Sequence, residues 1–258
     1  MKYTIDMHIH TEASKDSKTR IDVIAQRLKK RGVNCAIVTD HDGFTIDKVK
    51  KVDGVTFFPG VEFTTDRGHL LGLFMNGFEK PEYNGKKCSF YDAANIIHKY
   101  GGLCFRAHPF EYLSKTVDEV EKEAREISPY LDGIEVFNCR AVNKRHNAND
   151  LAKALQAELN LCASCGSDGH TPSEYGGAHI SVECDSEEKI PNEILAGRLE
   201  MYGSCVNRIN MAKSQLIKRC KRKEGIASYI TGVLYFGVCI AREAAARIRG
   251  ENKKCRRL

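Results

Sequence analysis

The chain has 258 residues, of which 42% are hydrophobic and 29% are charged, and its formal net charge is +6. A chain of this length can bury most of its apolar surface without cross-links, which excludes a scaffold that depends on disulfides. The eleven cysteines are scattered and no apolar leader follows Met1, so we expect a reduced, cytoplasmic protein.

The first expected element is a strand that carries Asp6-Met7-His8-Ile9-His10-Thr11. Side chains two apart on a strand point the same way, so His8 and His10 would present two imidazoles on one face. Met7 and Ile9 would lie on the other face. Such a pair can hold a metal ion, although His-x-His also occurs as hydrogen-bonded core residues. The number of further ligand residues downstream decides between these interpretations.

Short apolar runs alternate with amphipathic helices along the chain as far as residue 204. The first unit is a helix over Ile21–Arg31 followed by a buried strand over Cys35–Thr39. Further strands are expected over Thr56–Pro59, Leu70–Phe74, Leu103–Ala107, Gly133–Phe137, Leu161–Cys165 and Ala178–Glu183, and helices over Tyr91–Tyr100, Val117–Ile127, Asn149–Leu159 and Pro191–Leu199. This alternation predicts an α/β barrel or a related open sheet over residues 1–204.

Nitrogen and oxygen ligand residues recur near the ends of the expected strands, where α/β folds place their chemistry. The candidates are His8, His10, Asp16, His41, Glu62, His69, His108, Asp168 and His170. One zinc ion takes about four ligands, so this set suits two or three divalent ions with water completing each shell. Cysteine is absent from the set, which favours Zn, Mn or Fe.

Six motifs, in this order, resemble those of the polymerase and histidinol phosphatase (PHP) family of metal-dependent phosphoesterases. They are Asp6-x-His-x-His-Thr11, Thr39-Asp-His-Asp42, Gly60-Val-Glu62, His69-Leu-Leu-Gly-Leu73, Ala107-His-Pro109 and Gly166-Ser-Asp-Gly-His170. The resemblance runs from Tyr3 to about Gly203. It implies a distorted (β/α)7 barrel that holds a trinuclear metal site.

The resemblance also implies how the ligands divide among three metals. One metal would take His8, His10, Glu62 and Asp168, a second Glu62, His69 and His108, and a third Asp16, His41 and His170. Glu62 would bridge the first two metals, and Glu62 and Asp168 would act in catalysis as ligands. Hydrolysis of an anionic phosphate ester needs several cations, because they neutralise its charge and acidify a water to a bridging hydroxide.

Arg106 is the expected phosphate clamp and the third catalytic residue. It lies two residues before His108 on one strand and so can face the same cleft, and arginine pairs bidentately with phosphate. The alternative is an arginine that forms a salt bridge at the barrel rim. Asn138 and Arg140, also two apart, are further candidates for substrate contact.

The positive charge belongs to the C-terminal region. Residues 213–258 carry thirteen Lys/Arg against three Glu, a balance of +10 that leaves residues 1–212 at −4. Residues 205–258 are expected to form a helical extension, with a basic helix over Asn207–Lys223 and an uncharged stretch over Ile226–Ala241. Sixteen residues are short for a membrane span, so we favour packing against the barrel or in a homo-oligomer interface. The alternative is an anchor on a membrane surface or on nucleic acid.

The sequence therefore predicts a metal-dependent phosphoesterase that hydrolyses a phosphomonoester or phosphodiester of a small metabolite or nucleotide. Nucleotide specificity does not follow, because the most similar family members carry a long insertion where only 38 residues separate His69 from His108. An amidohydrolase-like C–N hydrolase, which shares His-x-His on a barrel strand, is one alternative. A non-catalytic, metal-stabilised module that binds nucleic acid or membranes through the C-terminal extension is the other.

Overall fold

A nearly closed, barrel-like sheet forms the body of the computed structural model, which describes residues 1–111, 114–141, 145, 147–204, 207–248 and 256–258. Around the ring, its strands are β10 (Cys162–Gly166), β9 (Gly133–Asn138), β8 (Leu103–Arg106), β5 (Gly68–Leu73), β4 (Val55–Thr65), β2 (Cys35–Val38) and β1 (Lys2–Ile9). The segment after β10 closes the ring against β1, because Asp168 N donates to His8 O at 2.8 Å and His10 N donates to Gly169 O at 3.0 Å. The expected distorted (β/α)7 barrel is confirmed.

Most neighbouring strands of the ring are parallel, but β5 runs antiparallel to both β4 and β8. β4 reaches β5 through a tight turn at Asp66 and Arg67, so no crossover helix lies between them. Beyond β1 the sheet continues antiparallel through β11 (Ala178–Glu183), β12 (Glu200–Gly203) and β13 (Arg256–Arg257). Short strands pair beside β4, namely β3 (Lys50–Val52), β6 (Tyr83–Asn84) and β7 (Lys87–Cys88).

A β-bulge in β1 changes which faces its side chains occupy. Asp6 pairs with Ala36 and Ile9 pairs with Val38, so β1 holds one more residue than β2 over the same span. Met7 joins a core cluster drawn from every strand of the ring, whereas Ile9 packs with residues of α1 (Ile21–Lys30). The expectation that Met7 and Ile9 share a face is therefore wrong, because the extra residue breaks the alternation.

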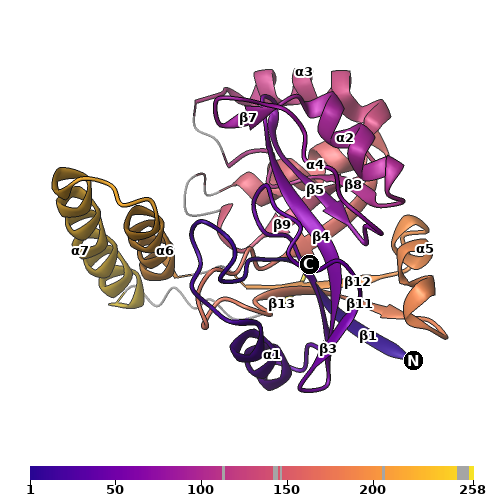
Figure 1. Ribbon diagram of the computed structural model, residues 1–258, viewed down its shortest axis with the longest axis horizontal. Helices are drawn as coiled ribbons and strands as arrows, with labels where there is room; N and C mark the ends of the chain where they lie inside the picture. The colour runs from indigo at the N-terminus through magenta and orange to yellow at the C-terminus, as the bar shows by residue number, and fades with distance from the viewer. Residues whose placement is uncertain (112–113, 142–144, 146, 205–206, 249–255) are drawn as a thin grey trace.

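Helices cover the outside of the ring (Figure 1). α1 buries Ile24, Ala25 and Leu28 in a cluster with β1, β2 and β4. α3 (Val117–Ile127) begins at a capping box, in which Thr116 Oγ1 accepts from Glu119 N at 3.2 Å and the Glu119 carboxylate accepts from Thr116 N at 2.7 Å. The other barrel helices are α2 (Phe90–Lys99), α4 (Ala148–Leu159) and α5 (Ile190–Leu195).

Two C-terminal helices, α6 (Arg208–Lys221) and α7 (Ile226–Ile248), lie side by side at one flank of the barrel (Figure 1). α6 is tied to the barrel because Lys221 Nζ donates to the Ser14 carbonyl at 2.7 Å. α7 packs on α6, and the apolar window Ile226–Ala245 is only 17% buried. The expectation that the uncharged stretch packs against the barrel is therefore wrong. Its helix also extends further than the uncharged residues, to a length and composition that could cross a membrane.

Candidate metal centre

All nine predicted ligand residues meet in one cluster. They form four overlapping groups whose ligand atoms lie within 4.8 Å of one another. The groups are His10 with Asp16, His41 and His170; His8 with Glu62 and His108; His8 with His10 and Asp168; and His41 with Glu62 and His69. The grouping follows the three expected ligand sets in part, because His10 also joins the group of Asp16, His41 joins Glu62 and His69, and His8 joins Glu62 and His108.

Glu62 lies at the centre of this cluster, within β4, and is 1% exposed. Its Oε1 lies 2.6 Å from His69 Nδ1 and 3.2 Å from His108 Nε2. Its Oε2 lies 3.0 Å from His41 Nδ1 and 3.3 Å from His10 Nε2. Burial alone would raise the pKa of Glu62, but positive charge on His69 and His41 holds the pKa well below its usual range. Oε2 also lies 3.5 Å from His8 Nε2, so the two carboxylate oxygens face different sets of imidazoles, as those of a bridging ligand would.

A buried carboxylate that sequence analysis did not assign fixes the orientation of His8. His8 Nδ1 lies 3.0 Å from Glu135 Oε1, and Glu135 Oε2 accepts from His108 N at 3.0 Å. A proton held on Nδ1 leaves the Nε2 lone pair of His8 directed at Glu62 and Asp168, the tautomer that binds metal. Burial opposes charge on this ring, yet Glu135 and Asp168 raise the pKa of His8.

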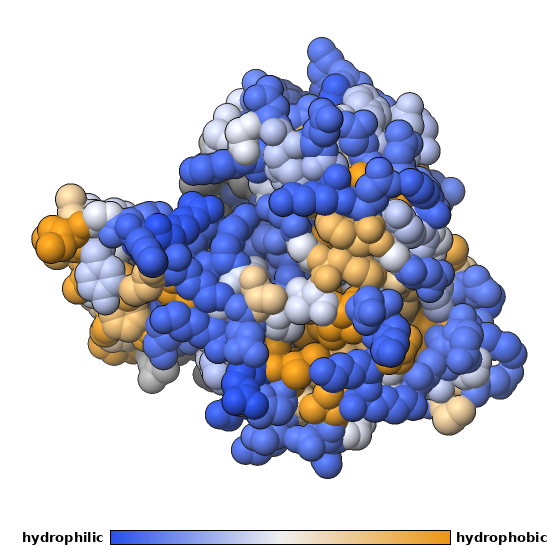
Figure 2. Space-filling model, in the orientation of Figure 1, coloured by the Kyte–Doolittle hydropathy of each residue, from blue (hydrophilic) through white to orange (hydrophobic). Residues whose placement is uncertain are grey.

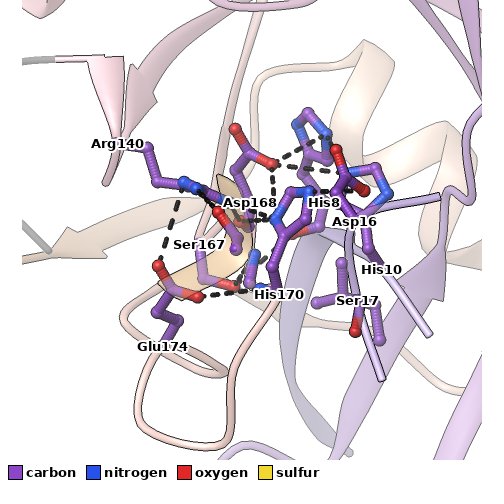
Figure 3. Close-up of polar contacts among 12 residues, drawn as sticks. His8, His10, Asp16, Ser17, Arg140, Ser167, Asp168, His170 and Glu174 are labelled. Atoms are coloured by element: carbon purple, nitrogen blue, oxygen red, sulfur yellow. Dashed lines mark hydrogen bonds and ion pairs between the residues drawn. The ribbon is translucent and has the colours of Figure 1, made fainter. Parts of the chain in front are cut away.

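Asp16 joins His41 and His170 at another side of the cluster. Asp16 Oδ1 lies 3.1 Å from His170 Nε2, and Asp16 Oδ2 lies 3.4 Å from His41 Nε2. His170 Nδ1 donates to the Asp168 carbonyl at 2.7 Å, which directs Nε2 at Asp16 (Figure 3). The loop after β1 orients Asp16, because Ser14 Oγ donates to its carboxylate at 2.9 Å.

This donor set fits divalent cations. His8 Nε2 and His10 Nε2 face each other at 3.2 Å, so a proton or a cation must lie between two lone pairs. Asp168 Oδ1 lies 3.7 Å from His8 Nε2 and 3.2 Å from His10 Nε2. Burial, with the nearby charge of His170, lowers the pKa of His10 well below its usual range, which favours the neutral ring that metals require.

Two further buried carboxylates hold the loop that carries Asp168 and His170. Asp6 Oδ1 accepts from Ser167 N at 2.9 Å, and burial raises the pKa of Asp6 to about 6. Glu174 Oε2 accepts from His170 N at 2.9 Å (Figure 3). Sequence analysis gave neither carboxylate a role, because hydrogen bonds to loop backbone leave no mark in the residue pattern.

Arg106 does not occupy the position expected of a phosphate clamp. Its guanidinium donates to Glu123 Oε1 at 2.6 Å and to the Arg67 carbonyl at 3.2 Å, and the side chain is 4% exposed. β8 ends at Arg106, and His108 adopts a positive φ of 23°, so the two side chains no longer follow strand alternation. Arg106 is the salt-bridge residue that was the alternative interpretation.

Asn138 and Arg140 differ in their access to the cluster. Asn138 Nδ2 donates to Glu135 at 3.0 Å and to Asp168 at 3.3 Å, and the side chain is fully buried, so it orients these residues and is not placed to contact substrate. Arg140 lines the cavity over the cluster and donates to the Asp168 carbonyl at 3.3 Å, with a further contact to His170 (Figure 3). The cavity has a volume of about 330 Å³.

A distorted α/β barrel with imidazoles and carboxylates clustered at its strand ends defines a class of metal-centred barrel proteins. A family model described as PHP-associated matches residues 146–199. The chain is 31% identical to an uncharacterized protein of Methanocaldococcus jannaschii over 147 residues, which are 52% of this chain and 80% of that protein. It is 24% identical to a protein of Proteus mirabilis named probable phosphatase over 220 residues, which are 74% of this chain and 88% of that protein.

The fold is similar to that of a solved lesion-specific endonuclease from Pyrococcus furiosus, with a TM-score of 0.55 and 19% identity. The match covers 76% of this chain and 56% of the endonuclease. The chain belongs to the PHP family.

Proposed function

We propose that the protein is a metal-dependent phosphoesterase that hydrolyses a phosphomonoester or phosphodiester of a small metabolite or nucleotide. The observation that carries the proposal is Glu62, one oxygen of which faces two imidazoles while the other faces three different ones. Two or three ions of Zn, Mn or Fe held by the nine ligands would neutralise the phosphate and acidify an attacking water.

The chain's own residues would orient the ligands and the substrate. Glu62 and Asp168 supply buried negative charge, and Glu135 keeps the proton of His8 on Nδ1. Arg140 is the proposed substrate contact, because its buried guanidinium lines the cavity beside His170. Arg140 also contacts Ser214 of α6, so the C-terminal extension helps to fix its position.

An amidohydrolase-like C–N hydrolase is supported less well. Asp16, Glu62 and Asp168 place three carboxylates among the imidazoles, a set that suits several cations and an anionic ester. A neutral amide would not need that much positive charge. The non-catalytic module is likewise disfavoured, because the cavity opens directly onto the ligand atoms.

A substrate panel on protein of measured metal content tests the proposal. The panel contains phosphomonoesters, phosphodiesters and amides, and the expected result is turnover of phosphate esters alone. Glu62→Gln should remove most of that turnover and lower the metal content, because an amide is a poorer bridging ligand than a carboxylate. Glu158→Gln on α4, which replaces an exposed glutamate, is the matched control. Turnover of amides alone, or full activity in Glu62→Gln, would refute the proposal.

We also propose that residues 205–258 are an extension distinct from the catalytic domain over residues 1–204, and that α7 binds an anionic membrane surface. Exposed apolar residues such as Ile230 and Leu234 run along α7, at 54% and 65% exposure. α6 packs on α7 and carries basic residues such as Arg219, which donates to Thr231 of α7, and positive charge there suits anionic headgroups. The protein would then be a cytoplasmic enzyme that binds to the surface of a membrane through α7.

A further inference from the structure

We infer that the cavity over the metal centre contains a second anion subsite, which α6 and two loops of the barrel build together. The inference rests on the proposed function for the group that reacts at the metals. It adds that the substrate carries another anionic group, such as a second phosphate or a carboxylate, at some distance from the first.

Cationic side chains from three separate segments line the cavity beside the ligand residues. Besides Arg140, they are Lys15, Lys86, Lys87, Lys218 and Arg222. The first comes from the loop after β1, the next two from the β6–β7 hairpin, and the last two from α6 or its C-terminal cap. Segments so far apart in the sequence meet here only because the barrel and α6 bring them to one opening.

The cations extend away from the metal ligands into an adjoining cavity of about 500 Å³. Lys15, Lys86 and Arg222 line both cavities, so they mark the passage from one to the other. Lys80 adds a further positive charge in the second cavity. Figure 2 shows hydrophilic side chains covering the junction between the C-terminal helices and the barrel. A group bound at this passage would lie beside the metal cluster without occupying it.

α6 is held firmly enough to form one wall of this subsite. Its Ser214 contacts Arg140, and its Lys218 Nζ lies 3.8 Å from Asp16 Oδ2. Lys221 Nζ donates to the carbonyls of Glu12 and Ser14, at 2.5 and 2.7 Å, and so ties α6 to the loop that carries Lys15. The C-terminal extension therefore contributes to the site itself, and its cations are specificity-determining residues for the proposed reaction.

The two cavities differ in charge, so the reacting group and the second anionic group of the substrate would bind at different places. The inner cavity contains the carboxylates of Asp16, Glu62 and Asp168, which metal ions would neutralise, and that of Glu111, which pairs with His108 at 2.8 Å. In the adjoining cavity Asp42 and Glu224 face the four cations Lys15, Lys80, Lys86 and Arg222, and Asp42 pairs with Lys15 at 3.5 Å. Net positive charge therefore remains at the passage after metal binding, and an anionic group would be drawn there.

Calorimetric titration of the metal-loaded, full-length protein with phosphonates tests the inference, because their C–P bonds resist phosphoesterases. Propylphosphonate carries one anionic group, and a series of diphosphonates with longer methylene linkers carries two. One linker length should bind at least about tenfold more tightly than the monophosphonate, as expected for added charge-assisted hydrogen bonds. Arg222→Ala and Lys86→Ala should each reduce that preference about fivefold or more. Metal content should not change, and the affinity for propylphosphonate should fall much less than the preference for the diphosphonate.

Lys213→Ala is the control. The substitution also removes one positive charge from α6, but Lys213 lines neither of the two cavities. Equal affinity for the monophosphonate and every diphosphonate would overturn the inference. An equal loss of the diphosphonate preference in Lys213→Ala would also overturn it, since the preference would then come from general electrostatic attraction. If the preference holds but the substrate panel shows no turnover, the subsite stands and the proposed reaction fails.

Discussion

His8 Nδ1 and Glu135 Oε1 lie 3.0 Å apart, and neither side chain is more than 1% exposed. The contact decides which nitrogen of His8 carries the proton, and with it whether Nε2 can bind a metal. In Glu135→Gln an NH2 group replaces one of the two carboxylate oxygens. It would face either His8 Nδ1 or the backbone N–H of His108, and one of the two hydrogen bonds would be lost. We expect metal affinity to fall about tenfold to a hundredfold, which chelator competition measures directly.

Glu158→Gln provides the matched control for that substitution, because its side chain is 47% exposed and pairs with Arg125 at the surface. Its metal affinity should equal that of the wild type. Wild-type affinity in Glu135→Gln would show that the contact with His8 has no bearing on metal binding.

Arg106→Ala should affect stability more than catalysis. The substitution removes a buried guanidinium and its hydrogen bonds, while Glu123 keeps its ion pair with Lys115, and should lower the free energy of unfolding by about 2 kcal/mol. Arg125→Ala, which breaks exposed ion pairs with Glu121 and Glu158, should cost less than about 1 kcal/mol. Urea denaturation gives both values. A raised KM in Arg106→Ala with unchanged stability would restore Arg106 as the phosphate clamp.

Asp6→Asn should change how stability depends on pH. The pKa of Asp6 is about 6 in the folded protein, against an ordinary value of 3.8, because burial disfavours its charge. Its contribution to stability is therefore complete below about pH 4 and is lost as the pH rises through about 6. Asparagine does not titrate, so the stability difference between wild type and variant should shrink by about 1 kcal/mol from about pH 5 to 7. A constant or growing difference in urea denaturation would contradict this assignment.

The meeting of the nine candidate ligand residues in one cluster could be predicted, because residue type and order carry the information. His8, Glu62 and Asp168 each stand in a short motif near a strand end, and strands of one barrel bring such residues together. Glu135 left a weaker signal, a carboxylate inside the otherwise apolar strand Gly133–Asn138, and it was missed.

Other features could not be read from the pattern, because they depend on local breaks in strand geometry or on tertiary packing. Arg106 was misplaced because strand alternation stops before His108, which adopts a positive φ. The bulge in β1 moved Ile9 to the α1 side for a related reason. The placement of α6 over the cavity depends on contacts such as Lys221 with the loop after β1, and a basic helix alone does not specify them.

α7 supplies the last prediction, a test of its proposed membrane surface. Vesicles of phosphatidylglycerol should carry the full-length protein upward in a flotation gradient, and vesicles of phosphatidylcholine should carry far less. High salt should weaken the binding without abolishing it, because headgroup attraction is screened whereas burial of apolar side chains is not. Replacing Leu234 and Val238 with glutamine should weaken binding more than about tenfold, since both apolar side chains are exposed at present.

Leu195→Gln is the control for these substitutions, because Leu195 is 42% exposed on α5 and lies away from α7. It should leave flotation unchanged. Three outcomes would contradict the proposal that α7 binds an anionic membrane surface. Equal binding to both kinds of vesicle would show a general apolar affinity. Salt-sensitive retention of nucleic acid without flotation would assign the basic face of α6 to a nucleic-acid partner. A dimer that dissociates when Leu234 and Val238 are replaced would show that α7 packs against a second copy of the chain.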